Sequence, residues 1–275
     1  MNQAAKSPAY ILGHSEVEIE RLKTQARRIG PVTARFFREA GIAPGMRVLD
    51  VGSGPGDVAF LEADIVGETG QVIGVDRSAE ALDVARLRAK EGGRKNVEFR
   101  VGDPTELKFD RPFDAIAGRY VLQFQKDPSA MLRKLAAHVR PGGLIVFHEI
   151  DWGGLSSFPA APTYDQCCRW GAETLRSHGT ESRMGMKLYS AFVGAGLPTP
   201  TLRLEALAGG GIGSAENVQL MADLMTILLP EMERLGVATA AEVGLETLVG
   251  RMSAEAIANE SVLVGHNQIA AWCRV

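Results

Sequence analysis

The sequence has few cysteines, no long apolar run and no excess of basic residues. Its three cysteines, Cys167, Cys168 and Cys273, do not have the spacing of a zinc site, and we expect them to be reduced thiols. A run of about 18 apolar residues is missing and the N-terminus lacks a signal-peptide pattern, which predicts a soluble, cytoplasmic protein without membrane insertion. The net charge of −3 disfavours a protein that binds nucleic acid, for which a basic stripe is expected.

What the sequence does contain is a glycine-rich stretch, RVLDVGSGPGD, at residues 47–57. Its first residues form a short apolar run, which predicts a buried parallel strand. Gly52, Gly54 and Gly56 then allow the backbone to turn tightly and a ligand to approach closely. From Asp57 onward, apolar residues predict a helix whose N-terminal amides point back at this loop. Strand, glycine loop and helix in this order indicate a nucleotide-type binding site, although a simple tight connection has the same pattern.

An acidic residue after the next strand strengthens the binding-site interpretation. QVIGVD, residues 71–76, predicts a second strand that ends in Asp76, 20 residues after Gly56. A carboxylate at this place can accept hydrogen bonds from both hydroxyl groups of a ribose. The loop has the pattern G-x-G-x-G followed by Asp57, and it lacks the third glycine of dinucleotide-binding loops. The Asp57 carboxylate would repel a pyrophosphate and is better tolerated near an ammonium group.

VLDVGSGPGD with VIGVD after it resembles the first two motifs of the class I S-adenosylmethionine-dependent methyltransferases, of the ubiquinone/menaquinone-biosynthesis-like small-molecule type. The RPGG stretch at 140–143 is a further hallmark of that family. The resemblance implies S-adenosylmethionine as the cofactor, with the glycine loop at its methionine part, Asp76 at the ribose and Asp103 at the adenine. An N-terminal arm would fold over cofactor and substrate. The residues implied in cofactor binding are Tyr10, Arg21, Gly52, Ser53, Gly54, Gly56, Asp76, Arg77, Gly102, Asp103, Pro104, Arg119 and Tyr120.

Some of these positions also have ordinary interpretations. Asp103 precedes Pro104, a combination that is common in turns. Tyr10 equally suits a contact that fastens the first helix to the rest of the protein. The tip of the fourth strand, residues 118–120, is expected to face the transferable methyl group because parallel sheets bind ligands beyond the carboxyl ends of their strands. The strand is not followed by an Asn-Pro-Pro-aromatic motif, which by the resemblance disfavours methylation of a nucleobase.

Strands and helices alternate between residues 47 and 151, which predicts a parallel sheet with helices on both faces. The resemblance extends this to a Rossmann-like, doubly wound, seven-stranded and mostly parallel α/β sheet with an antiparallel C-terminal strand and a helical cap. We expect one domain in three parts: an N-terminal helical arm or lid (1–45), the S-adenosylmethionine-binding half (46–151), and a part that completes the sheet and carries helical insertions over the acceptor site (152–275). Pro31 is expected to break the N-terminal helix into two.

Methyl transfer from a sulfonium is a one-step displacement, which needs an aligned acceptor and exclusion of water but no metal. A general base helps where the acceptor is a hydroxyl or an enolisable carbon. The candidates for a base or an acceptor-positioning residue are His148 and Glu149, at the end of the fifth strand, and His14, in the N-terminal arm. His148 also fits a hydrogen-bonded buried histidine and Glu149 a structural carboxylate. Proximity alone could also suffice.

The sequence therefore predicts an S-adenosylmethionine-dependent methyltransferase that acts on oxygen, carbon or nitrogen of a small organic acceptor, and it leaves a homodimer open. One alternative is an NAD-type Rossmann oxidoreductase, which the missing third glycine and the lack of a hydride-transfer signature disfavour. The other is a non-catalytic metabolite-binding protein on the methyltransferase fold, because fold does not imply activity.

Overall fold

The computed structural model describes residues 16–275, with side chains described from residue 27 onward. These residues form two compact units. The sheet unit comprises Leu22–Glu149, Gly185–Leu204 and Ile269–Val275. The helical unit comprises Ile150–Met184 and Glu205–Gln268, together with the first residues of the N-terminal helix. The chain therefore passes several times from one unit to the other.

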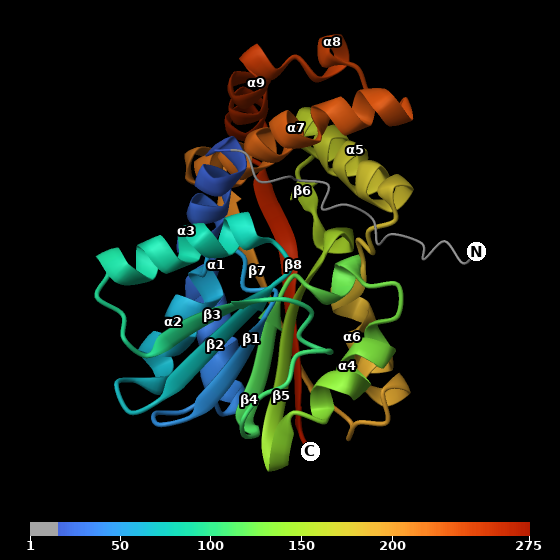
Figure 1. The fold of residues 1–275 in the computed structure, drawn as a ribbon. Helices are drawn as coiled ribbons and strands as arrows, with labels where there is room; N and C mark the ends of the chain where they lie inside the picture. The colour runs from blue at the N-terminus through green and yellow to red at the C-terminus, as the bar shows by residue number, and fades with distance from the viewer. Residues whose placement is uncertain (1–15) are drawn as a thin grey trace, which may run out of the picture. The chain divides into compact units, whose positions relative to one another are not determined.

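The sheet unit is built on parallel strands in the order β3-β2-β1-β4-β5 (Figure 1). All residues of β1 are buried, as expected for a central strand covered on both faces. The last residues of β8 run beside β5 in the opposite direction, since the amide of Val275 donates to the carbonyl of Gly143 over 3.0 Å. The strand bounds are β1 Arg47–Val51, β2 Gln71–Asp76, β3 Val97–Val101, β4 Phe113–Arg119, β5 Val139–Asp151 and β8 Val262–Arg274.

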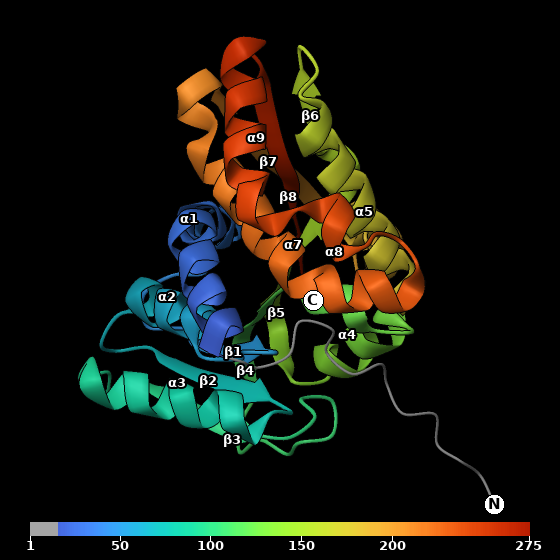
Figure 2. The ribbon, with the colours of Figure 1, turned by 90° about the horizontal axis from the view of Figure 1, so that it is seen from above.

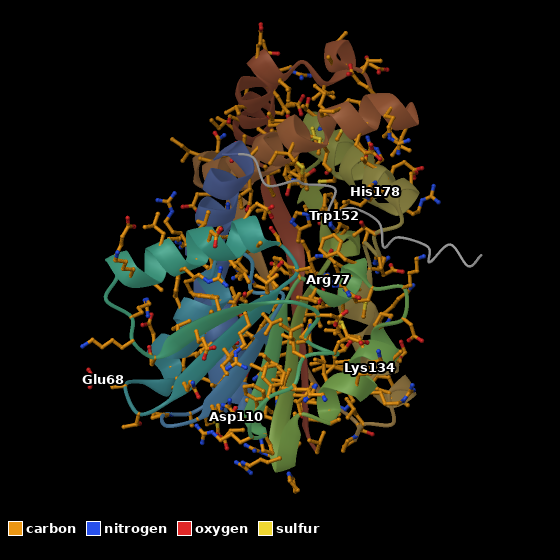
Figure 3. The ribbon with its side chains drawn as sticks, in the orientation of Figure 1. Glu68, Arg77, Asp110, Lys134, Trp152 and His178 are labelled. Carbon is orange, nitrogen blue, oxygen red and sulfur yellow. The ribbon has the colours of Figure 1, made fainter. Side chains whose placement is uncertain are left out.

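The helices of the sheet unit connect these strands, so that the carboxyl ends of the strands meet at one edge. Helix α3 begins after Ser78, whose hydroxyl accepts a hydrogen bond from the amide of Ala81 over 3.1 Å. Figure 3 labels Arg77 beyond the carboxyl end of β2 and Asp110 toward the opposite end of the strands. The helix bounds are α1 Glu16–Ala40, α2 Asp57–Val66, α3 Ala79–Glu91, η1 Leu122–Phe124, α4 Pro128–Ala136 and α6 Met184–Gly194.

Helix α1 is continuous, so the predicted break at Pro31 is wrong. Pro31 lies on an exposed position of the helix, where water can bond to the carbonyl group that a proline leaves unpaired. The buried side of the helix carries Ile29, Val32 and Phe36 on both sides of the proline. Their packing keeps the halves of α1 before and after Pro31 in one continuous helix.

The helical unit contains three longer helices, α5, α7 and α9, which pack against one another (Figure 2). Strand β6 pairs antiparallel with residues 262–264 of β8, and β7 also pairs with β8. The bounds are η2 Trp152–Gly154, β6 Ser156–Phe158, α5 Pro162–His178, β7 Thr201–Gly210, η3 Gly211–Ser214, α7 Ala215–Leu235, α8 Ala240–Val243 and α9 Leu245–Ala258. Helical insertions were expected within residues 152–275, and α5, α7, α8 and α9 lie there.

The predicted fold class is confirmed: a mostly parallel α/β sheet with an antiparallel C-terminal strand and helices around it. Residues 16–275 form eight strands instead of seven, because the three-residue β6 is too short to show an alternating pattern. The predicted division of the chain at residues 45 and 151 stays a prediction. Within the part of the chain that is described, no helix has the length and apolar character needed to cross a membrane.

Candidate functional site

The glycine loop joins β1 to α2 in the sheet unit. Gly52, Gly54 and Gly56 have φ angles of 68°, 49° and 93°, a left-handed backbone that residues with a Cβ rarely adopt. The amides of Gly52 and Ser53 donate to the carbonyl of Val75 over 2.8 and 3.1 Å, which fastens the loop to the end of β2. A Cβ added to Gly54 would meet no atom within 4 Å, so this part of the loop faces open space.

Asp76 lies at the end of β2 and binds the loop through its side chain. Its Oδ2 accepts a hydrogen bond from the amide of Gly54 over 2.9 Å, and its Oδ1 accepts one from the amide of Ser78 over 2.9 Å. Each carboxylate oxygen keeps a further lone pair for a ligand. Ser53, the residue before Gly54 in the loop, has a buried hydroxyl with no hydrogen-bond partner among the described residues. Burying a hydroxyl without a hydrogen bond costs free energy, unless a ligand or a water molecule forms that bond.

Asp57 follows the loop at the start of α2 and is neutralised by an arginine. Arg88 of α3 donates to Asp57 Oδ1 over 2.7 Å and to the carbonyl of Pro55 over 2.6 Å. The charge of Asp57 is therefore compensated within the chain, and its predicted repulsion of a pyrophosphate is weakened. The missing third glycine remains the argument against a dinucleotide.

Asp103 follows β3 and forms an ion pair with Arg77, so two residues predicted to bind the cofactor lie in direct contact. Arg77 donates to Asp103 Oδ2 over 2.6 Å, and the hydroxyl of Thr105 donates to Oδ1 over 2.8 Å. Burial opposes ionisation, but the hydrogen bonds from Thr105 and Arg77 hold the pKa of Asp103 below its usual value. Gly102 donates its amide to the carbonyl of Asp76 over 2.9 Å, and Pro104 is buried. The ends of β2 and β3 thus form one acidic edge.

Arg119 and Tyr120 lie at the end of β4. Arg119 Nη1 donates to Thr33 Oγ1 of α1 over 3.2 Å, and the Arg119 guanidinium carbon lies 5.6 Å from the centre of the Tyr120 ring. Tyr120 has a φ angle of 59°, a left-handed conformation that is uncommon for a bulky residue. An observed backbone outlier of this kind points to a functional constraint.

His148, at the end of β5, is fully buried. Its Nδ1 lies 3.2 Å from Thr33 Oγ1, and its ring centre lies 5.0 Å from that of Phe36 and 5.3 Å from that of Tyr120. This is the environment of a hydrogen-bonded buried histidine. Thr33 contacts both His148 and Arg119, and the sequence pattern gave no signal for it because a threonine inside a helix is unremarkable there.

Glu149 is also fully buried, and its carboxyl group binds backbone amides. Oε1 accepts hydrogen bonds from the amides of Val121 and Leu122 over 2.8 and 2.7 Å. Burial raises the pKa of Glu149 to about 8, although the amides of Leu122, Val121 and Gln123 favour the ionised form. Oε2 has no hydrogen-bond partner among the described residues. Glu149 therefore holds the turn after β4.

Two buried acids near the loop were not singled out from the sequence. Asp50 lies in β1 and Glu62 in α2, and both are fully buried. Burial raises the pKa of Asp50 well above its usual value, and the charge of Arg119 opposes this rise. Burial and the nearby Asp50 likewise raise the pKa of Glu62. The available signal was a charged residue inside the apolar VLDV strand, where an ordinary core strand would have none.

The structure brings most of the predicted residues to the carboxyl edge of the sheet unit. They form a loop group (Gly52, Ser53, Gly54, Gly56, Asp76), an acidic edge (Arg77, Gly102, Asp103, Pro104) and a rim (Arg119, Tyr120, His148, Glu149). Tyr10 and His14 lie outside the described residues, as does the side chain of Arg21. Where the chain is described, no group of three His, Cys, Asp or Glu side chains could hold a metal ion.

Comparison with known proteins matches this region to one family. A family model described as a methyltransferase domain matches residues 42–188. The matched range contains the loop group, the acidic edge and the rim.

Two curated relatives and one solved structure extend the comparison. Demethylmenaquinone methyltransferase of Lactococcus lactis is 33% identical over 134 residues, which are 48% of this chain and 51% of that protein. Ubiquinone biosynthesis O-methyltransferase of Bordetella bronchiseptica is 30% identical over 167 residues, which are 55% of this chain and 68% of that protein. The chain spans about half the length of most curated relatives it matches. The YcgJ protein of Bacillus subtilis shares the fold, with a TM-score of 0.51 and 21% identity over 87% of this chain and 96% of that chain.

Proposed function

Because the chain belongs to the family of methyltransferase domains, we propose that it moves a methyl group from S-adenosylmethionine to oxygen, carbon or nitrogen of a small organic acceptor. The observation that carries the proposal is the hydrogen bond between the amide of Gly54 and the Asp76 carboxylate. It joins a loop that faces open space to an acid with lone pairs left for a ligand.

The residues of the loop group suit this cofactor. The buried hydroxyl of Ser53 needs a partner, and a ligand with polar groups at the loop would provide one. Asp76 would accept from the ribose hydroxyls, and the acidic edge formed by Asp103 and Arg77 would meet the adenine. When bound, S-adenosylmethionine supplies a methyl group on a positively charged sulfur.

The task of the chain is then to align the acceptor and to exclude water. The rim residues Arg119 and Tyr120 lie at the carboxyl end of β4, where ligands of open parallel sheets bind. Their positions are fixed by α1 through Thr33 and by the ring of His148. A rim held in this way would favour an approach of the acceptor atom in line with the methyl carbon. Such positioning contributes strongly to the rate of a displacement.

The names of two relatives suggest which acceptors to try first. Demethylmenaquinone methyltransferase and ubiquinone biosynthesis O-methyltransferase are named for quinone substrates or pathways. Quinones and phenols therefore come first in a screen, and amines follow. We propose a small molecule and no nucleic acid as the acceptor, in agreement with the acidic balance of the chain.

Calorimetry with S-adenosylmethionine and S-adenosylhomocysteine tests the proposal, with NAD as a control ligand. Asp76→Ala is expected to weaken binding about tenfold, which corresponds to about 1.4 kcal/mol. Asp83→Ala is the matched control, because Asp83 is an exposed residue of α3 whose partner is Arg86. Its affinity should equal that of the unmodified protein. Heat from NAD and none from either sulfur compound would refute the proposal.

A further inference from the structure

The turn that follows β4, residues 120–122, is held by two consecutive residues of β5. The amide of Tyr120 donates to the carbonyl of His148 over 2.9 Å. The next two amides, those of Val121 and Leu122, both donate to Oε1 of Glu149. Three successive amides of this exit turn are thus bound by His148 and Glu149. The amides of Val121 and Leu122 thus share one side-chain acceptor, while the carbonyls of Tyr120 and Val121 accept weaker bonds from the side chains of Gln123 and Gln125, each over 3.4 Å.

Tyr120 shows why the exit turn needs to be held. Its left-handed backbone is unfavourable for a residue with a Cβ, so it persists only where neighbouring contacts fix it. Glu149 binds the two amides that follow, and the ring of His148 packs on the Tyr120 ring at 5.3 Å. Without the Glu149 bonds, the turn could relax and the ring of Tyr120 would leave the rim.

The exit turn also packs against the glycine loop. A Cβ built on Gly52 would lie 2.7 Å from Cγ2 of Val121, so the Val121 side chain sits directly on the Gly52 backbone. The amide of Gly52 in turn donates to the carbonyl of Val75 at the end of β2. Glu149, Val121 and Gly52 therefore form a continuous chain of contacts from β5 to the loop.

Glu149 itself is badly placed to take a proton from an acceptor. Its carboxyl group is fully buried, and its Oε1 is already occupied by two amides. We propose that Glu149 is a positioning residue, whose carboxyl oxygen fixes the exit turn so that Tyr120 stays at the rim and Val121 supports the glycine loop. The role of the loop as a cofactor site rests on the proposed function, whereas the contacts between turn and loop do not.

Two substitutions separate positioning from base chemistry. Glu149→Gln keeps an oxygen that can accept both amides, and it removes the ability to ionise. Glu149→Leu has a similar size and leaves the part-buried amide of Val121 and the buried amide of Leu122 without this partner. Leu132→Ala, a buried change in α4 that touches neither Glu149 nor the amides bonded to it by any hydrogen bond, is the control for general loss of stability.

Amide hydrogen exchange provides a readout that needs no ligand. In Glu149→Leu, exchange is expected to rise in residues 120–123 and in residues 52–56 together, whereas Glu149→Gln and Leu132→Ala should leave both segments close to the unmodified protein. Exchange that rises only in residues 120–123 would overturn the coupling to the loop. If Glu149→Leu does not fold, Val121→Ala takes its place: it should loosen residues 52–56 while the amides bonded to Glu149 stay protected.

Calorimetry with S-adenosylhomocysteine gives the second readout. We expect Glu149→Leu to bind at least about tenfold more weakly, and Glu149→Gln within about threefold of the unmodified protein. Equal losses in Glu149→Leu and Leu132→Ala, or a loss in Glu149→Gln as large as in Glu149→Leu, would refute a positioning role. If the unmodified protein does not bind the probe, the proposed function fails, and the exchange experiment still decides the role of Glu149.

Discussion

Replacing Glu149 by glutamine is expected to change how the stability of the protein depends on pH. Burial raises the pKa of Glu149 from 4.5 to about 8 in the folded chain, against the opposing effect of the backbone amides. At a pH between these two pKa values, Glu149 keeps its proton in the folded protein and releases it in the unfolded protein. The Glu149 contribution to stability is therefore fully present at low pH and is lost as the pH rises toward 8.

The size of the effect follows from the two pKa values. Within this window the free energy of unfolding falls by about 1.4 kcal/mol per pH unit. Integrated from about pH 5.5 to about pH 7.5, the Glu149 contribution falls by about 2–3 kcal/mol. Glutamine cannot ionise, so the variant lacks this dependence. Asp50 and Glu62, whose pKa values burial also raises, titrate in both proteins, and their effect cancels in the comparison.

Urea unfolding of the unmodified protein and Glu149→Gln at these two pH values, followed by circular dichroism, measures the difference. The m-values must agree, so that changes in midpoint report stability. The expected result is that the unmodified protein loses about 2–3 kcal/mol of stability relative to the variant at the higher pH. A difference between the two proteins that does not change with pH would show that Glu149 is already ionised in the fold, and the argument from its burial would be refuted.

Two substitutions and one labelling experiment test the site and the core. Thr33→Val removes the hydroxyl that accepts from Arg119 and should lower the free energy of unfolding in urea by about 1–3 kcal/mol; an unchanged midpoint would contradict this. Gly54→Ala should cost only about 1–2 kcal/mol of stability, yet weaken S-adenosylhomocysteine binding in calorimetry at least about tenfold, because the methyl group would stand in the open space beside the loop. Equal affinity would show that no ligand lies there. Cys167 and Cys273 are buried, and burial raises the pKa of each to about 11, so a thiol reagent should modify them only after unfolding; rapid labelling of the folded chain would contradict their burial.

The parts of the fold that the sequence predicted well are those set by local chemistry. The glycine loop needs left-handed backbone at Gly52, Gly54 and Gly56, and only glycine adopts it readily. The position of Asp76 could be predicted because the carboxyl ends of parallel strands share one edge of the sheet. An acid at the end of β2 therefore lies at the same edge as the glycine loop after β1. The cap at Ser78 is equally local, because its side chain bonds within the first turn of the helix that follows it.

The parts that were missed depend on neighbours far apart in the sequence. Thr33 became part of the site only because α1 brings it to Arg119 and His148, which are more than 80 residues away. Glu149 could not be recognised as the residue that holds the exit turn until β4 and β5 were known to be neighbours. The prediction of a helix break at Pro31 was wrong for the same reason. The packing of Val32 and Phe36 keeps the helix continuous although proline locally disfavours it.

The bonds that hold the glycine loop, from Val75 and Asp76, are made within the chain itself. An incoming ligand consequently does not have to restrict the backbone of this segment, and that part of the conformational entropy is already lost on folding. Association at such a preformed surface needs no slow rearrangement of the loop, so encounter and release can both be fast. A loop ordered in this way suits a protein that must exchange a spent ligand for a fresh one in every cycle.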